Sequence, residues 1–138
     1  MSEIQLPDII NHIRKQITTQ RNESRIKATG EVFTPTELVQ ELLDQLPQDL
    51  FRDPNKTFLD PTCGDGQFLG EILIRKIENG STFEQALSTI YGVDIMPDNI
   101  DECRKRLLCG QTHLIHIVEK NIVCHDALTY DFFFNKLK

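Results

Sequence analysis

The sequence predicts an α/β protein with a doubly wound parallel sheet. Short apolar segments typical of strands alternate with segments in which apolar residues recur at helical spacing. The first such strand, over residues 57–60, leads directly into a turn rich in aspartate and glycine, and a helix follows from about Phe68. A strand, a tight glycine turn and a helix in this order are typical of nucleotide-type cofactor sites.

Residues 1–29 are expected to form a helical segment and a connector ahead of the main domain. Four isoleucines between Ile9 and Ile17 make a one-sided apolar stripe, which predicts an amphipathic helix over residues 5–20. A polar connector follows this helix. Residues 30–138 are expected to form the cofactor-binding domain.

A second helix is expected just before the first strand. Thr34 is placed to cap it, with Pro35 at the first helical position and Glu37 three residues after the cap. Apolar residues at positions 38 to 46 line one face, and Pro47 is expected to end the helix.

After the glycine turn, the same alternation continues to the end of the chain. Gly80 is expected to end the helix that starts near Phe68. The segments that follow are a short helix starting at Ser81-x-x-Glu84, a buried strand over 90–95, a helix from Pro97, a segment over 114–118 that fits strand or helix, and a strand over 122–124.

The turn after the first strand carries the most specific signal. Asp60 and Asp65 lie beside Gly64 and Gly66. A pyrophosphate favours backbone N–H groups without nearby anions, so these carboxylates favour a ligand with a cationic end. S-adenosylmethionine has an ammonium and a sulfonium. Aspartate and glycine are also common in ordinary turns, so this segment alone leaves a purely structural turn open.

Four segments together resemble the motifs of adenine-N6 DNA methyltransferases from restriction–modification systems. Asp-Pro-Thr-Cys-Gly-Asp-Gly-Gln-Phe-Leu at 60–69 is similar to the first motif of that family. Gly-Glu-Val-Phe-Thr-Pro at 30–35 is similar to the cofactor motif that the family places before it. Tyr-Gly-Val-Asp-Ile at 91–95 resembles the second motif, and Cys-His-Asp-Ala-Leu at 124–128 the third. The matches occur in the family's order.

This resemblance implies a Rossmann-like sheet of the S-adenosylmethionine-dependent methyltransferase type, with S-adenosylmethionine as cofactor. Thr34 would bond the methionine carboxylate of the cofactor, and Asp60 its amino group. Asp94 would accept from the ribose hydroxyls, and Asp126 from the adenine amine. Turn or helix-cap roles remain alternatives for Thr34, Asp94 and Asp126. The implied cofactor-binding residues are Phe33, Thr34, Asp60, Thr62, Gly64, Gly66, Phe68, Asp94, Ile95, Asp126 and Ala127.

The catalytic motif of the family, a polar residue followed by Pro-Pro and an aromatic residue, does not occur in this sequence, whose last proline is Pro97. We therefore expect a truncated domain, with no catalytic residue in this chain, that acts on adenine in DNA only with a second chain. The strand at 57–60 would then be an edge strand. Together with the aromatic run 132–134, it predicts a homodimer or a hetero-complex.

Two other functions stay open. One is a stand-alone S-adenosylmethionine-binding or regulatory module without activity. The other is a small-molecule methyltransferase, which is disfavoured because the motif at 30–35 precedes the first strand.

Composition limits the partners and the location. With 138 residues, 39% hydrophobic and 26% charged, the chain fits one soluble globular domain. Its net charge of −6 has the wrong sign for a protein that acts mainly by gripping phosphates. Four scattered cysteines without Cys-x-x-Cys spacing argue against a metal site and fit a reducing compartment. The sequence has no signal peptide and no apolar run of membrane-spanning length, so we expect a cytoplasmic protein without a membrane partner.

Overall fold

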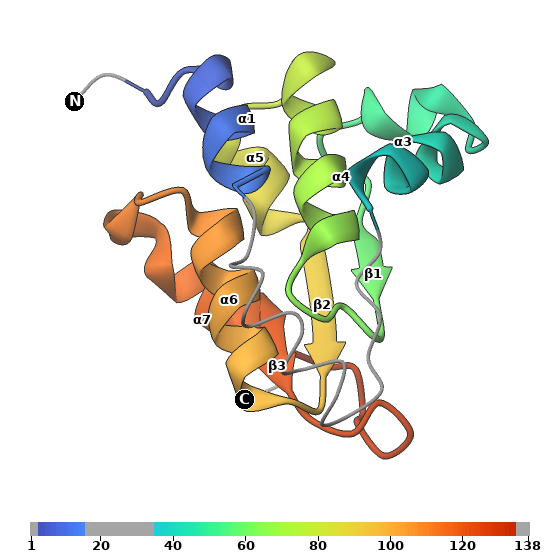
Figure 1. Cartoon of the computed structure of the whole chain (residues 1–138), viewed down its shortest axis with the longest axis vertical. Helices are drawn as coiled ribbons and strands as arrows, with labels where there is room; N and C mark the ends of the chain where they lie inside the picture. Colours follow the sequence, from blue (N-terminus) through green and yellow to red (C-terminus); the bar gives the residue numbers. More distant parts are fainter. Residues whose placement is uncertain (1–2, 16–34, 135–138) are drawn as a thin grey trace.

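The computed structural model describes residues 3–15 and 35–134. From β1 onward strands and helices alternate, which confirms the α/β class (Figure 1). The elements are α1 (Leu6–Ile13), α3 (Thr36–Asp44), η1 (Gln48–Phe51), β1 (Phe58–Asp60), α4 (Gln67–Glu78), α5 (Phe83–Ser88), β2 (Ile90–Asp94), α6 (Pro97–Leu108), η2 (Thr112–Leu114), α7 (Ile115–Asn121) and β3 (Ile122–Cys124).

The three strands form one parallel sheet in the order β1-β2-β3. Leu59 of β1 is in register with Tyr91 of β2, and Val93 of β2 with Val123 of β3. Helices α4 and α6 follow β1 and β2 and both pack against β2 (Figure 1). Because the strands are parallel, the turns that follow all three strands gather at one edge of the sheet, where ligands bind in open α/β folds.

The two faces of the sheet differ in what covers them. A Cβ on Gly92 would lie 2.8 Å from Leu69 Cδ1 and 2.9 Å from Cys63 Cβ, so this face of β2 packs closely under α4. Side chains alternate along a strand, which directs Tyr91 to the opposite face. There its ring lies 4.8 Å from that of Phe134. The described residues therefore place α4 on one face and the C-terminal aromatic segment on the other.

Strand β1 is an edge strand within the described part of the chain, as the sequence predicted, because it pairs with β2 alone. The side chain of Leu59 in this strand is 49% exposed. No described strand covers this exposed apolar side chain on the outer side of β1.

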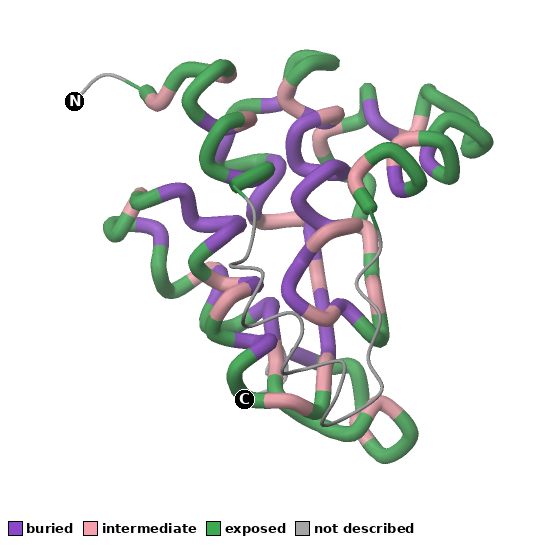
Figure 2. Tube along the Cα trace, viewed as in Figure 1, coloured by how far each residue is buried: buried purple, intermediate pink, exposed green. Residues whose placement is uncertain are grey.

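The core lies between the helices and the helix-covered face of the sheet, where Figure 2 shows buried segments along α4 and β2. Helix α1 joins this core through Ile9 and Ile13, which are 1% and 2% exposed. Burial of such side chains stabilises the fold by about 1.5–3 kcal/mol each. A Cβ on Gly70 would lie only 2.6 Å from Ile13 Cγ2, so α1 sits directly on α4.

The N-caps of α3 and α5 each lie one residue later in the chain than the sequence predicted. Helix α3 begins at Thr36, and Pro35 is its N-cap in extended conformation, with φ −64° and ψ 148°, instead of its first helical residue. The capping box of α5 uses Thr82 and Gln85, whose reciprocal bonds are 3.1 and 2.9 Å long. Ser81 was expected in that role, but its N–H instead bonds the Lys76 carbonyl at the end of α4. Gly80 follows α4 with a φ of +110°, as expected for a helix stop.

Other local predictions were only partly right. Of the apolar stripe expected on α3, Val39 and Leu43 are buried, whereas Leu38, Leu42 and Leu46 are 39–44% exposed. The helix ends at Asp44, ahead of Pro47. A short 3₁₀ helix, η1, replaces part of the expected loop at 48–56, and the ambiguous segment at 114–118 is helical. The first helix is shorter than the predicted range of residues 5–20, because α1 ends at Ile13 with Arg14 as its C-cap. Residues 16–20 of that range lie outside the described residues.

Candidate cofactor site

The turns after β1, β2 and β3 bring the predicted acidic residues to one edge of the sheet. Asp60 ends β1 and Asp94 ends β2, while Asp126 follows β3 by two residues. The N–H of His125 donates to the Asp94 carbonyl at 2.9 Å, which holds the chain after β3 beside the end of β2. Parallel pairing thus places the first, second and third motif segments next to one another.

Asp60 is a half-buried carboxylate with an unfavourable electrostatic environment. Its Oδ1 accepts hydrogen bonds from the Thr62 N–H at 3.1 Å and from Thr62 Oγ1 at 3.5 Å. Burial raises the pKa of Asp60 above its usual value and the negative charge of Asp94 raises it further, whereas the Thr62 bonds oppose these effects. Among the described residues, neither carboxylate forms an ion pair with a lysine or arginine.

Asp94 connects the end of β2 to the glycine turn and to α6. Its Oδ1 accepts the Gly64 N–H at 3.3 Å, and its Oδ2 accepts the Met96 N–H at 3.0 Å and Asn99 Nδ2 at 3.2 Å. A carboxylate has about four acceptor positions, so these three bonds leave capacity for a further donor. The structural role and the predicted ligand role are therefore compatible at this residue.

Gly64 and Gly66 occupy positions that favour glycine for partly different structural reasons. Gly64 has a φ of +55° and Gly66 a φ of +95°, conformations that favour glycine at both positions. A Cβ on Gly64 would meet no atom within 4 Å, so Gly64 borders open space. A Cβ on Gly66 would lie 3.0 Å from Cys103 Sγ and 3.3 Å from Cys103 Cα. The absent side chain of Gly66 thus makes room for α6, a reason that the sequence did not reveal.

The remaining predicted site residues fall into several environments. Ile95 directly follows Asp94 and is 61% exposed. Phe68 is partly buried and packs against the core. Asp126 is exposed, and its Oδ1 accepts the Leu128 N–H at 2.9 Å, which is the turn role considered as its alternative. Ala127 beside it is half-buried. Phe33 and Thr34 lie outside the described residues.

Two buried side chains at this site were not predicted from the sequence. Asn99 is 1% exposed and donates to Asp94, and Arg106 is 7% exposed and donates to the Asp65 carbonyl at 2.9 Å. Both lie on the inner face of α6. Their spacing of seven residues, which places them on one face of a helix, was the signal available in the sequence.

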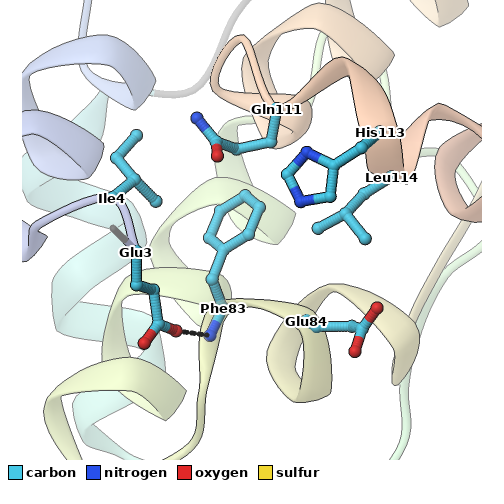
Figure 3. Close-up of a pocket in the computed structure, with 7 residues that line it drawn as sticks. All are labelled: Glu3, Ile4, Phe83, Glu84, Gln111, His113 and Leu114. Atoms are coloured by element: carbon cyan, nitrogen blue, oxygen red, sulfur yellow. Dashed lines mark hydrogen bonds between the residues drawn. The ribbon is translucent and has the colours of Figure 1, made fainter. Parts of the chain in front are cut away.

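A separate cavity of about 240 Å³ is lined by Glu3, Ile4, Phe83, Glu84, Gln111, His113 and Leu114 (Figure 3). It is bounded by the segment before α1, the start of α5 and the segment between α6 and α7, all of which lie away from the carboxyl ends of the strands. Phe83 N–H donates to the Glu3 carboxylate at 3.3 Å on its wall. No predicted cofactor residue lines this cavity.

Comparison with known proteins identifies the family. The sequence profile described as N-6 DNA Methylase matches residues 5–137. The chain belongs to this family. It is also similar to the Type II methyltransferase M.VspI of Vibrio sp. (strain 343), with 34% identity over 110 residues. That alignment covers 78% of this chain but 23% of the relative, so this N-6 DNA methylase family member spans about a quarter of the length of the protein it resembles. The comparison with solved structures gave no match.

Within residues 3–15 and 35–134, no helix has the length and apolar character needed to cross a membrane. The same residues contain no group of three or more histidine, cysteine, aspartate or glutamate side chains arranged to hold a metal ion.

Proposed function

We propose that this chain is the S-adenosylmethionine-binding portion of a DNA adenine-N6 methyltransferase, built on a Rossmann-like doubly wound sheet. The observation that carries the proposal is the pair of carboxylates at adjacent strand ends, Asp60 and Asp94, around an open glycine turn. The negative charge of Asp94 contributes to the raised pKa of Asp60, and neither carboxylate forms an ion pair with a lysine or arginine among the described residues. A ligand with a cationic end and hydroxyl donors would relieve this arrangement.

The residues present fit the chemical groups of this cofactor. Asp60 would hold the ammonium group, and Asp94 would accept from the ribose hydroxyls with its remaining acceptor position. Ile95 offers an exposed apolar side chain for the adenine ring, and Asp126 an acceptor for the adenine amine. Gly64 borders the space where a ligand can approach the backbone. We propose that Phe33, Thr34, Thr62, Gly66, Phe68 and Ala127 complete or support the site.

When bound, S-adenosylmethionine supplies an electrophilic methyl group on its sulfonium. The residues of this chain would bind and orient that group. Holding an adenine base for methylation requires a pocket for a nucleotide extruded from the duplex. The sequence has no Pro-Pro pair to build the family's version of that pocket. We therefore propose that methyl transfer to DNA requires a second chain.

The partner would bind at the open side of β1. Among residues 3–15 and 35–134, no strand pairs with the outer side of β1, and the side chain of Leu59 there is exposed. Phe133 and Phe132 of the C-terminal segment are 51% and 36% exposed and add apolar surface. Exposed apolar patches mark interaction sites. A homodimer or a complex with a catalytic and target-recognition chain would cover this surface.

Calorimetric titration with S-adenosylmethionine tests the cofactor assignment. We expect binding of S-adenosylmethionine and of its demethylated product, and no binding of ATP, because phosphates meet the repulsion of Asp60 and Asp94. Absence of binding at millimolar cofactor, with the protein folded by circular dichroism, would reject the proposal. Tighter binding of ATP than of S-adenosylmethionine would reject it equally.

A stand-alone binding module is the second candidate, supported by the missing Pro-Pro motif. The two candidates differ in their genetic context and in their activity. A neighbouring reading frame that opens with a strand and an Asn-Pro-Pro-aromatic motif, and that restores transfer of radiolabelled methyl groups to DNA when co-purified with this chain, supports the methyltransferase. Methyl transfer by the chain alone would contradict the need for a second chain.

A further inference from the structure

Arg106 is a buried guanidinium that contacts two separate parts of the chain. On one side its Nε donates to the carbonyl of Asp65 at 2.9 Å, and its Nη2 lies 3.5 Å from the Asp65 carboxylate. On the other side its Nη1 donates to the carbonyl of Ile13. These bonds span 41 and 93 residues of sequence. One side chain of α6 therefore joins the glycine turn to the end of α1.

The contact between Arg106 and the glycine turn is made at a conformationally costly part of the backbone. Asp65 lies between Gly64 and Gly66, two residues with positive φ. Glycine loses more conformational freedom on ordering than any other residue, so a Gly-x-Gly turn is costly to hold in one shape. A Cβ on Gly66 would lie 3.4 Å from Arg106 Cδ, so the arginine stem also packs against the turn. Arg106 thus supports the turn by both hydrogen bonding and packing.

The contact between Arg106 and α1 is made at Ile13, where the end of α1 packs tightly against α4. Ile13 fills the space above Gly70 of α4, where an added Cβ would be 2.6 Å away. The next residue, Arg14, forms a bidentate pair with Glu71 of α4, with bonds of 3.0 and 2.8 Å. The end of α1 is therefore held against Gly70 and Glu71, about one helical turn after the glycine turn that starts α4.

We propose that Arg106 is a positioning residue of the cofactor site, which fixes the glycine turn in its binding conformation and makes that conformation depend on the docking of α1. The inference rests on the function proposed above. Arg106 does not touch the cofactor in this account, because it is buried beneath the turn. It acts through the Asp65 carbonyl, in the same turn whose Gly64 N–H donates to Asp94 at 3.3 Å.

A lysine at position 106 should not be able to make both of the carbonyl contacts that Arg106 makes. A guanidinium presents five N–H donors in a rigid fork and can bond two carbonyls that lie in different directions, whereas an ammonium is a single point of charge on a flexible stem. Arg104 provides a matched control on the same helix. It also donates to backbone carbonyls, those of Ile122 and Glu119, but these are remote from the glycine turn.

The experiment compares Arg106→Lys with Arg104→Lys in the full 138-residue chain. Thermal unfolding, calorimetric titration with S-adenosylmethionine and amide hydrogen exchange are measured for both. We expect Arg106→Lys to weaken affinity about tenfold, the size of one charge-assisted hydrogen bond. Exchange at the amides of residues 64–66 should become faster. Arg104→Lys should lower the melting temperature while its affinity stays within about twofold of the wild type.

A second variant keeps the proposal testable if Arg106→Lys does not fold. Gly70→Ala leaves Arg106 in the sequence and pushes on Ile13 from α4, with the new Cβ 2.6 Å from Ile13 Cγ2 but at an ordinary contact distance of 3.5 Å from Arg106 Cδ. We expect this variant to disturb α1 docking, to weaken affinity and to speed exchange in the turn as well. Unchanged affinity and unchanged exchange in whichever of these variants folds would overturn the proposal. If the wild type binds no cofactor, the proposed function fails, and the exchange measurement still decides whether Arg106 fixes the turn.

Discussion

Replacing Asp60 with asparagine should stabilise the free protein and weaken cofactor binding. Asparagine keeps an Oδ1 acceptor for the Thr62 N–H, which is 3.1 Å away, so the turn after β1 can persist. The substitution removes a negative charge that burial and the neighbouring Asp94 carboxylate disfavour. Residues that bind ligands often carry such a stability cost.

The size of the stability change depends on pH. The pKa of Asp60 is higher in the folded protein than in the unfolded chain. Protonation of Asp60 therefore favours the folded state: this contribution to stability is complete below the unfolded pKa of about 3.9 and is lost as pH rises through the folded pKa. At pH 7 the wild type bears the full cost of an ionised, half-buried carboxylate. Asp60→Asn should therefore raise stability by about 0.5–1 kcal/mol at pH 7, the scale of a partly screened charge interaction, and by much less near pH 4.

The loss of binding should be larger than this gain. A charge-assisted hydrogen bond is worth about 1.5–3 kcal/mol, so affinity for S-adenosylmethionine should fall by about 10- to 150-fold. In the wild type, affinity should also weaken as pH is lowered toward the raised pKa of Asp60, because Asp60 must lose its proton to pair with the ammonium group. The Asp60→Asn variant should show a flatter pH dependence.

Chemical denaturation at pH 4 and pH 7, together with calorimetric titration, measures both effects. Asp53→Asn is the matched control, because Asp53 Oδ1 accepts the Asn55 N–H at 2.9 Å in a turn that precedes β1. That variant should leave affinity unchanged. An Asp60→Asn protein that is less stable than the wild type at pH 7 and binds S-adenosylmethionine equally well would refute the reasoning.

Three further substitutions test other parts of the account. Asp94→Ala should weaken S-adenosylmethionine binding by at least about 1.5–3 kcal/mol in a calorimetric titration, and unchanged affinity would remove Asp94 from the site. Gly92→Ala should lower the free energy of unfolding by about 1–3 kcal/mol, because the new Cβ would lie 2.9 Å from Cys63 Cβ; a fully stable variant in urea denaturation would show that the packing under α4 is looser than described. Leu59→Lys should reduce self-association or partner binding in sedimentation equilibrium, whereas Leu128→Lys, at a side chain that is 93% exposed and outside β1, should not. Equal effects of these two lysines would argue against the β1 edge as the contact.

The sequence predicted the strand and helix order from β1 to β3 because each strand there is a short apolar run bounded by turn residues. The ends of the helices were harder to predict from the sequence. Ser81-x-x-Glu84 and Thr82-x-x-Gln85 are both capping-box patterns, and only the closing bonds of α4 decide between them. The segment at 114–118 has no clear apolar period, so its helical state depends on packing against α5 and α6.

The site was partly predictable for a related reason. Asp60 and Asp94 end neighbouring parallel strands, so topology alone brings them together. Asn99 and Arg106 could not be assigned in the same way, because their partners depend on where α6 packs. A buried arginine whose hydrogen-bond partners are backbone carbonyls leaves no motif in the sequence, since any residue can supply a carbonyl.

The central claim is that S-adenosylmethionine binds at the carboxyl edge of this sheet. A titration of ¹⁵N-labelled protein with S-adenosylmethionine, followed by amide chemical shifts, tests it most directly. We expect shifts concentrated at residues 60–68, 94–96 and 126–127, with little change around the cavity at Phe83 and Leu114. Binding with shifts centred on that cavity, or no shift at saturating cofactor in folded protein, would contradict it.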